Sequence, residues 1–401
     1  MTKQEKVIVF MLGLLPFLMV IGNSMFIPLL PTMEVDMGIS TFQSGLILTV
    51  FSIPAALSIP FVGILADRIG RKRVVMTSLI VIALGSLVCA GATFLNGELA
   101  YSILLVGRFV QGLGAGGTAS LAMTFIGDRF YGEKRSVALG TMEVFNGLGK
   151  AISPILGALA ALLIWTSTFW VYFLLATLAL IGISKFIHEV EEDKITVNMT
   201  DYIKGVFLAM KKEAWWITPV MFAGGVALFL LFGLLVYLSY EVERVYGMGG
   251  ITKGLIIAIP LTVFTMASFY AGKKVGQESE KVTSLLVVSL ALCMLPISFA
   301  LIYHSFIATV IYLTLIGAGV GFFLPCCNFL VTSAVSHHER GMVVSFYHMI
   351  RFLGVAFGPV VYSSWMMNEW GMFLKSFVLL GVVAVWLKGT FPTKRLVLQK
   401  G

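Results

Sequence analysis

Long apolar runs separated by short polar segments dominate the chain. Most of these runs approach the roughly 20 residues that a helix needs to cross the hydrocarbon layer of a bilayer. The pattern therefore predicts an all-α polytopic membrane protein with twelve transmembrane helices in two pseudo-symmetric six-helix bundles. The predicted spans are 7–30, 44–66, 74–95, 100–126, 137–164, 168–184, 217–240, 254–271, 282–301, 305–331, 343–366 and 372–387.

The composition supports a membrane protein and excludes an ordinary soluble domain. Of the 401 residues, 58% are hydrophobic and only 12% are charged, about half the charged fraction of soluble proteins. The first apolar run is longer than the hydrophobic part of a signal peptide, so we expect it to be retained. The four cysteines lie within predicted spans and lack zinc-ligand spacing, so we expect no metal site, and they carry no information about a disulfide framework.

The distribution of basic residues predicts the orientation in the membrane. If the N-terminus is cytoplasmic, most of the 28 lysine and arginine residues fall in cytoplasmic segments, whereas Arg244, Lys253 and Lys375 lie outside. This asymmetry follows the positive-inside rule, so we expect both termini to be cytoplasmic. We expect the protein to be a multi-pass protein of the plasma membrane. Loops that face an anionic leaflet explain the net charge of +8 without nucleic acid as a partner.

A polar stretch, residues 188–216, divides the chain near its midpoint. It predicts an N-terminal bundle (1–186), a cytoplasmic linker with an interfacial helix (187–216) and a C-terminal bundle (217–401).

Several residues recur in the second half at a constant offset. Gly112, Gly114 and Gly116 of GLGAGG precede Gly317, Gly319 and Gly321 of IGAGVG by 205 residues each. The same offset relates Gly149 to Gly354 and Pro154 to Pro359. Recurrence over successive elements indicates an internal repeat, and six helices per half predict a parallel repeat.

Three motifs resemble the major facilitator superfamily, specifically its twelve-helix drug:proton antiporter branch. They are GILADRIGRKRV at 63–74, RFVQGLGAG at 108–116 and GKAISPILGA at 149–158. The third is similar to a motif of exporters that exchange a drug-like solute for protons, although Ser153 and Ala158 stand where glycine is usual and Lys150 is atypical. The resemblance implies two bundles that rock around a central site.

The first motif predicts a cytoplasmic gate. The resemblance implies that its residues latch the cytoplasmic side in the outward-open state, with Asp67 accepting hydrogen bonds and Arg71 pairing with a carboxylate such as Asp128. The alternative is a basic loop that only fixes the topology. The expected gate residues are Gly63, Asp67, Arg68, Gly70, Arg71, Lys72 and Asp128.

Two glycine and proline pairs stand at equivalent places in spans five and eleven. A proline removes a helical hydrogen bond. Gly149 with Pro154, and Gly354 with Pro359, are therefore either bends for the rocking motion or sites of tight packing.

Four charged side chains lie well inside predicted spans: Arg108, Glu143, Lys150 and Arg351. Each costs about 2.5–3.5 kcal/mol on insertion scales, so we expect them to face a hydrated cavity or each other. At about 100° per residue, Glu143 and Lys150 share one helical face, with Asn146 between them. The repeat maps this stripe onto span eleven, where His348 and Arg351 stand.

The buried charges supply the candidate chemistry. Glu143 and Arg108 are the proton-coupling candidates, because a carboxylate that alternates between apolar and cationic surroundings can take up and release a proton. The alternative is that Glu143 is a structural partner of Arg108 or Lys150. The candidate substrate-binding residues are Asn23, Arg108, Glu143, Asn146, Lys150, Asn328, His348 and Arg351.

Two functions remain in competition. The first is an exporter of a small amphipathic solute or drug that works by proton antiport with alternating access. The second is an exporter of an anionic or zwitterionic metabolite or lipid-like molecule, bound by Lys150 and Arg351 and not necessarily coupled to protons, since the expected cavity carries more cations than anions. GLGK fails as a phosphate loop and the histidines lack a metalloprotease spacing, so we expect no enzyme, cofactor or pump. We expect a monomer.

Overall fold

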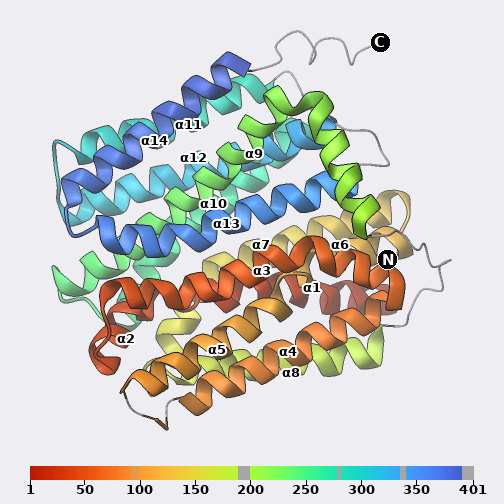
Figure 1. Cartoon of the computed structure of the whole chain (residues 1–401), viewed down its shortest axis with the longest axis horizontal. Helices are drawn as coiled ribbons and strands as arrows, with labels where there is room; N and C mark the ends of the chain where they lie inside the picture. The colour runs from red at the N-terminus through yellow and green to blue at the C-terminus, as the bar shows by residue number, and fades with distance from the viewer. Residues whose placement is uncertain (93, 96, 188–198, 278–280, 335–339, 391–401) are drawn as a thin grey trace. The chain divides into compact units, whose positions relative to one another are not determined.

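The computed structural model describes residues 1–92, 94–95, 97–187, 199–277, 281–334 and 340–390 (Figure 1). Every regular element in these ranges is helical, so the predicted all-α fold is confirmed. The helices are α1 (Lys3–Ser24), the short 3-10 helix η1 (Ile27–Leu29), α2 (Leu30–Met37), α3 (Thr41–Ile69), α4 (Arg71–Ala92), α5 (Gly97–Ala115), α6 (Thr118–Arg129), α7 (Gly132–Ala160), α8 (Ser167–Phe186), α9 (Met199–Arg244), α10 (Gly250–Gln277), α11 (Lys281–Ala300), α12 (Phe306–Ser333), α13 (Arg340–Trp365) and α14 (Glu369–Thr390).

The helices correspond to the twelve predicted spans. The first span consists of α1, η1 and α2, because Pro28 and Pro31 lack the backbone N–H that a continuous helix would use. The fourth span consists of α5 and α6. Among the described residues, eleven helical segments are long and apolar enough to cross a membrane. The helix α7 is not one of them, because Glu143, Asn146 and Lys150 lower its mean hydropathy.

Local sequence signals set several helix ends. Ser40 accepts a hydrogen bond from the Gln43 backbone N–H while the Gln43 side chain accepts one from the Ser40 N–H, a reciprocal capping box that starts α3. Gly70 ends α3 with φ of 99°, a value that strongly favours glycine. Ser305 caps α12 by accepting a hydrogen bond from the Ala308 N–H.

The division into two halves differs in detail from the expected one. The described chain forms two compact units, one of residues 1–198 with 248–258 and the other of residues 199–247 with 259–401. The second part of the expected linker is helical, but it is continuous with span seven in the 46-residue helix α9. A position at the membrane interface therefore stays a prediction. Residues 188–198 of the linker lie outside the described ranges.

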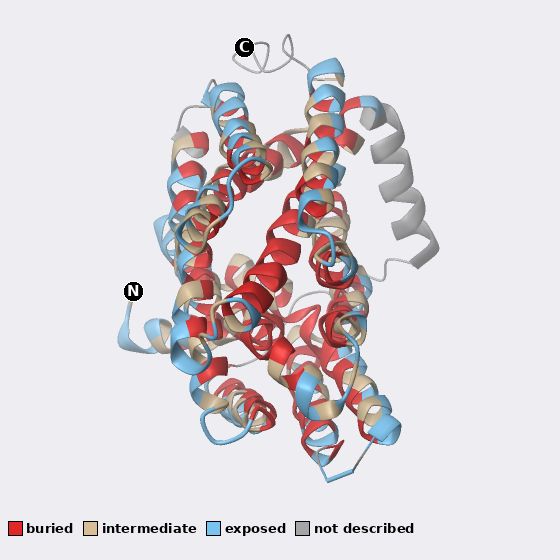
Figure 2. Cartoon of the chain, turned by 90° about the vertical axis from the view of Figure 1, so that its left-hand side faces the viewer, coloured by how far each residue is buried: buried red, intermediate tan, exposed pale blue. Residues whose placement is uncertain are grey.

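Many large apolar side chains are exposed on the outer faces of the helices. Figure 2 shows buried residues along the helix faces that meet neighbouring helices and exposed residues on the opposite faces. Leu163, Phe269 and Val385 are 87%, 62% and 73% exposed. A water-soluble protein seldom exposes so much apolar surface, whereas lipid chains cover it without penalty.

Glycines bring helices into close contact at equivalent places in the two units. In the first unit, a Cβ on Gly149 would lie 3.3 Å from Val20 Cβ of α1. In the second unit, a Cβ on Gly354 would overlap the carbonyl oxygen of Gly225 of α9. Val20 and Gly225 differ by the same 205 residues as the two glycines, so the sequence repeat extends to the packing partners. These contacts favour tight packing as the role of both glycines.

We predict that Gly354→Ala lowers the thermal stability of the detergent-purified protein by about 1–3 kcal/mol, the usual effect of overpacking. The added methyl group would push α13 away from α9. Gly381→Ala is the matched control, because this glycine also lies within a helix but no atom approaches its added Cβ within 4 Å. Equal melting temperatures for Gly354→Ala and the control would contradict the packing role.

Candidate functional site

Arg108 lies at the centre of the first unit and is completely buried. Its Nε donates a hydrogen bond to the Ile47 carbonyl oxygen at 3.0 Å, and its Nη1 donates to the Gly22 carbonyl oxygen at 2.8 Å and to Gln111 Oε1 at 2.8 Å. The guanidinium group therefore joins α1, α3 and α5. All these acceptors are neutral oxygens, so the expected pairing of Arg108 with the Glu143 carboxylate is not among the contacts of the described chain.

Two aromatic rings complete the surroundings of Arg108. Its guanidinium carbon lies 4.5 Å from the centre of the Phe26 ring and 4.4 Å from that of Phe51. Cation–π contacts of this kind contribute about 2 kcal/mol or more when they are desolvated. Arg108 is thus stabilised as a buried cation by carbonyl oxygens, the Gln111 amide oxygen and two rings of its own unit.

Unpaired polar atoms lie close to Arg108. Asn23 is 3% exposed, and neither its Oδ1 nor its Nδ2 has a hydrogen-bond partner in the described chain. Nη2 of Arg108 also lacks one. Because Asn23 follows Gly22, whose carbonyl oxygen binds Arg108, the two candidates are neighbours in α1 and α5. Buried polar atoms without partners are rare, so this place suits water or a polar ligand group.

The predicted polar stripe of Glu143, Asn146 and Lys150 lies on α7, and none of the three side chains is fully buried. Glu143 is exposed and makes no hydrogen bond or ion pair with another described residue, whereas Asn146 and Lys150 are half-buried. Oδ1 of Asn146 is shielded from solvent and has no partner. Seven residues of α-helix separate Glu143 from Lys150 by about 10 Å along the axis, so these two charges do not pair within α7.

The second unit carries the equivalent groups on α13 and α12. The guanidinium carbon of Arg351 lies 5.5 Å from the centre of the Tyr347 ring, and its Nε is shielded from solvent without a hydrogen-bond partner. His348 lies beside Tyr347, with ring centres 6.1 Å apart. On α12, Oδ1 of Asn328 also lacks a partner. The three candidates of this unit, Asn328, His348 and Arg351, therefore include two unsatisfied polar atoms, on Asn328 and Arg351.

The gate motif makes the contact that the sequence predicts for Arg71. Arg71 at the start of α4 forms an ion pair with Asp128 near the end of α6, and Lys72 donates a hydrogen bond to the Ser184 carbonyl oxygen of α8 at 2.9 Å. The turn at Gly70 allows these contacts because it reverses the chain between α3 and α4. Gly63 and Arg68 lie in the last turns of α3, and the side chain of Asp67 lies outside the described part.

A profile of the Major Facilitator Superfamily matches residues 12–359. The chain belongs to the major facilitator superfamily. As a member it is a multi-pass membrane protein that transports small molecules across a membrane, and it is not an enzyme.

Named relatives agree with this assignment. The chain is 38% identical over 371 residues to the bacillibactin exporter of Bacillus subtilis (strain 168), covering 91% of both chains. It is 22% identical to the multidrug transporter protein MdtP of the same organism over 364 residues, covering 77% of this chain and 66% of the relative. The human organic anion transporter MFSD10 shares the fold, with a TM-score of 0.73, 19% identity and coverage of 96% and 100% of the two chains.

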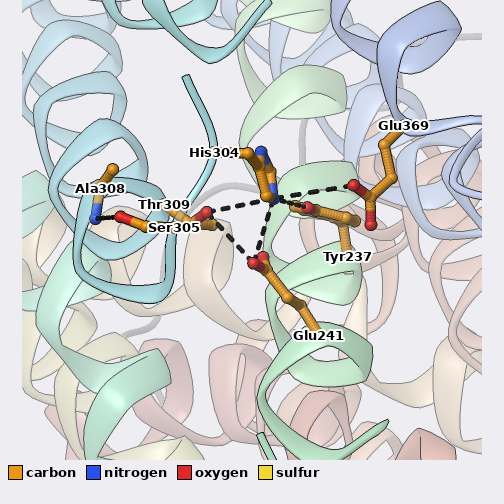
Figure 3. Close-up of polar contacts among 7 residues, drawn as sticks. All are labelled: Tyr237, Glu241, His304, Ser305, Ala308, Thr309 and Glu369. Carbon is orange, nitrogen blue, oxygen red and sulfur yellow. Dashed lines mark hydrogen bonds and ion pairs between the residues drawn. The ribbon is translucent and has the colours of Figure 1, made fainter. Parts of the chain in front are cut away.

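The second unit of this superfamily member also buries a carboxylate that the sequence analysis did not select. Glu241, near the end of α9, contacts His304 and Thr309 in a polar cluster (Figure 3). The sequence contains one signal for it, since Tyr237 and Glu241 are one helical turn apart in YLSYEVER. The predicted span seven ends at residue 240, four residues before the end of α9, so Glu241 lies just outside the predicted spans.

We predict that Arg108→Lys destabilises the protein by about 2–3 kcal/mol although the charge is kept, because a lysine cannot replace the fork of donors that binds Gly22, Ile47 and Gln111. The melting temperature in detergent measures this loss. Arg129→Lys is the control, as Arg129 is half-buried near the end of α6. A melting temperature of Arg108→Lys equal to that of the control would show that only the charge matters.

Proposed function

We propose that the chain exports a small anionic or zwitterionic metabolite in exchange for protons, by alternating access. One observation carries the proposal: Asn146 and Arg351 occupy equivalent positions of the repeat, and each has a polar atom that is shielded from solvent and unpaired in the described chain. A bound solute would supply the missing partners.

The inventory of charges favours an anionic group on the solute. Carbonyl oxygens and rings of its own unit already solvate the Arg108 cation. Among the remaining candidate residues, Lys150 of the first unit and Arg351 of the second are cations, and Glu143 is the single carboxylate. A net positive site attracts anions and repels lipophilic cations. The Arg351 side chain can also bind a carboxylate or a similar planar anion with two hydrogen bonds.

The similarity to the bacillibactin exporter supports export as the direction and bacillibactin as the first solute to test. It extends over 91% of both chains, so most of both units is matched. The proposal places the protein in the plasma membrane as a monomer with cytoplasmic termini, as the basic residues predict.

Proton coupling is assigned to Glu143 within this proposal. Its carboxylate is exposed on α7 and makes no hydrogen bond or ion pair with another described residue. The Arg71 and Asp128 ion pair joins α4 to α6 at the expected cytoplasmic side and supports the proposed latch. Breaking such a pair on inward opening would expose both charges to water, where the loss is small.

A second candidate is efflux of drug-like solutes with a broad range. The similarity to the multidrug transporter protein MdtP and the motif at 149–158 favour it. Lipophilic cations would be the typical solutes, and they would be attracted by Glu143 rather than by Lys150 or Arg351.

We predict that inverted membrane vesicles holding the protein accumulate bacillibactin when their lumen is acidic, and that accumulation falls when the pH gradient is collapsed. We also predict that Arg351→Gln raises the KM for bacillibactin about tenfold, since a hydrogen bond to a charged group contributes about 1.5–3 kcal/mol. Initial uptake rates over a range of solute concentrations measure both effects.

Lys185→Gln is the control, because Lys185 is an exposed cation at the end of α8. Uptake of a lipophilic cation that exceeds uptake of bacillibactin, and that survives Arg351→Gln, would select the second candidate. Uptake of bacillibactin that ignores the pH gradient would remove the antiport mechanism while leaving the solute class intact.

A further inference from the structure

A buried polar cluster lies at one end of the second unit, away from the candidate residues of α13. Glu241 Oε1 is 3.2 Å from His304 Nε2 and 3.2 Å from the Thr309 hydroxyl, which donates to it. The Tyr237 hydroxyl, one turn earlier in α9, is 2.8 Å from the same histidine nitrogen. Glu369 Oε2, at the start of α14, is 3.7 Å from it. Figure 3 shows these side chains converging on His304.

Two carboxylates share one histidine nitrogen in this cluster. His304 Nε2 lies 3.2 Å from Glu241 Oε1 and 3.7 Å from Glu369 Oε2, and it can carry only one hydrogen. With a neutral histidine, the buried Glu241 carboxylate and the half-exposed Glu369 carboxylate lie near the same nitrogen without a cation, and their negative charges repel each other. With a protonated histidine, one charge is neutralised and the ring donates to a carboxylate. The geometry therefore favours uptake of a proton.

A second feature points to the same chemistry. Glu241 Oε2 is buried and has no hydrogen-bond partner in the described chain, although the side chain is only 2% exposed. An ionised oxygen in such a place is poorly solvated. A proton on this carboxylate would remove the charge, so Glu241 can accept a proton that His304 passes on.

Exposure decreases stepwise through the cluster. The side chains of Glu369, His304 and Glu241 are 48%, 32% and 2% exposed. A proton from water can reach Glu369 or His304 directly and then the buried carboxylate across a single hydrogen bond. All three residues lie on the same side of the second unit. Glu241 is near the end of α9, His304 is in the connection before α12, and Glu369 is at the start of α14. The predicted topology places this end outside the cell.

Four other charged or titratable side chains of the second unit make contacts with residues outside the cluster. Arg244 lies over the Tyr240 ring at 4.7 Å, and Lys375 of α14 lies over the Trp365 ring at 5.3 Å. Tyr246 packs on Phe306 with ring centres 4.8 Å apart, and the Tyr362 hydroxyl of α13 is 2.5 Å from the Ser376 hydroxyl. None of these contacts provides a cation to Glu241, which leaves His304 as its charge partner in the described chain.

We propose that Glu241 and His304 form a proton-binding site that takes up a proton from the extracellular side and couples it to export. This site is additional to Glu143, and the coupling rests on the antiport function proposed above. The hydrogen bond to Glu241 raises the pKa of His304 from its ordinary value of about 6.5, burial opposes this, and the charges of Glu241 and Glu369 add to the rise. These surroundings therefore favour the protonated form of His304 over the neutral form.

The test measures export of bacillibactin from proteoliposomes as the pH on the extracellular face is varied between about 5 and 9. Glu241→Gln removes the carboxylate that favours the imidazolium, so the midpoint of the pH dependence should move to lower pH by about one unit or more. His304→Gln should flatten the dependence. Glu98→Gln is the matched control, because Glu98 is an exposed carboxylate at the start of α5, also on the expected extracellular side.

The pH dependence of the melting temperature tests the same site without measuring transport. Because the pKa of His304 is raised on folding, its contribution to stability is full below the unfolded value and is lost as the pH rises through the folded value. The melting temperature of the purified protein should therefore fall between about pH 6 and 8, and His304→Gln should remove that fall. If Glu241→Gln does not reach the membrane, Glu369→Gln, at a more exposed position, should give a smaller shift of the same sign.

The outcomes separate the inference from the function on which it rests. Absence of any bacillibactin export by the unaltered protein would refute the proposed function, and the melting curves would still test proton binding. Normal export whose pH midpoint is the same in Glu241→Gln, Glu369→Gln and Glu98→Gln would refute the site alone. A melting temperature of His304→Gln with unchanged pH dependence would refute it as well.

Discussion

The removal of polar groups from water within an apolar helical protein constrains every feature of this structure. A buried polar atom without a partner costs about 1–3 kcal/mol, and an unpaired charge costs more. Most of the Arg108 guanidinium group has partners within the protein, because carbonyl oxygens from α1 and α3 and two rings surround it. Arg108 therefore holds these helices together. Polar atoms that fail to meet the constraint, on Asn23, Asn146 and Arg351, are therefore the informative ones. They mark where a solute or water has to complete the structure.

The same constraint explains the role of glycine. Helices in lipid gain little from hydrophobic association, so they need close contact to gain dispersion energy. Gly354 meets the Gly225 backbone, Gly112 meets the Phe51 backbone, and Gly317 meets the Pro260 backbone, each within its own unit. Both units thus use one packing scheme, in which glycines of the later helices touch the backbone of the earlier ones. Pro154 and Pro359 lie inside α7 and α13, which continue through them as helices.

The sequence predicted the fold well because the bilayer permits so few solutions. The length of each apolar run, the basic segments and the repeat were enough for the helices and the family. The pairing of Arg71 with Asp128 followed from the motif. The partners of Arg108 did not, because backbone carbonyl oxygens leave no trace in a sequence. Glu241 was missed for a related reason: its partners His304 and Glu369 lie far away in the chain, in segments whose composition looks like ordinary loops.

Proton coupling requires more than a group that binds a proton. A proton bound by Glu241 and His304 can shift a conformational equilibrium only to the extent that one state binds it more tightly than the other. A difference of about two pKa units between the states amounts to about 2.7 kcal/mol, or a hundredfold change in their ratio. The cluster can provide such a difference, because its residues come from α9, α14 and the connection before α12. A small separation of these segments would break the short contacts to His304 and hydrate Glu241. Both changes weaken proton binding, so the packed arrangement is the one that a proton stabilises.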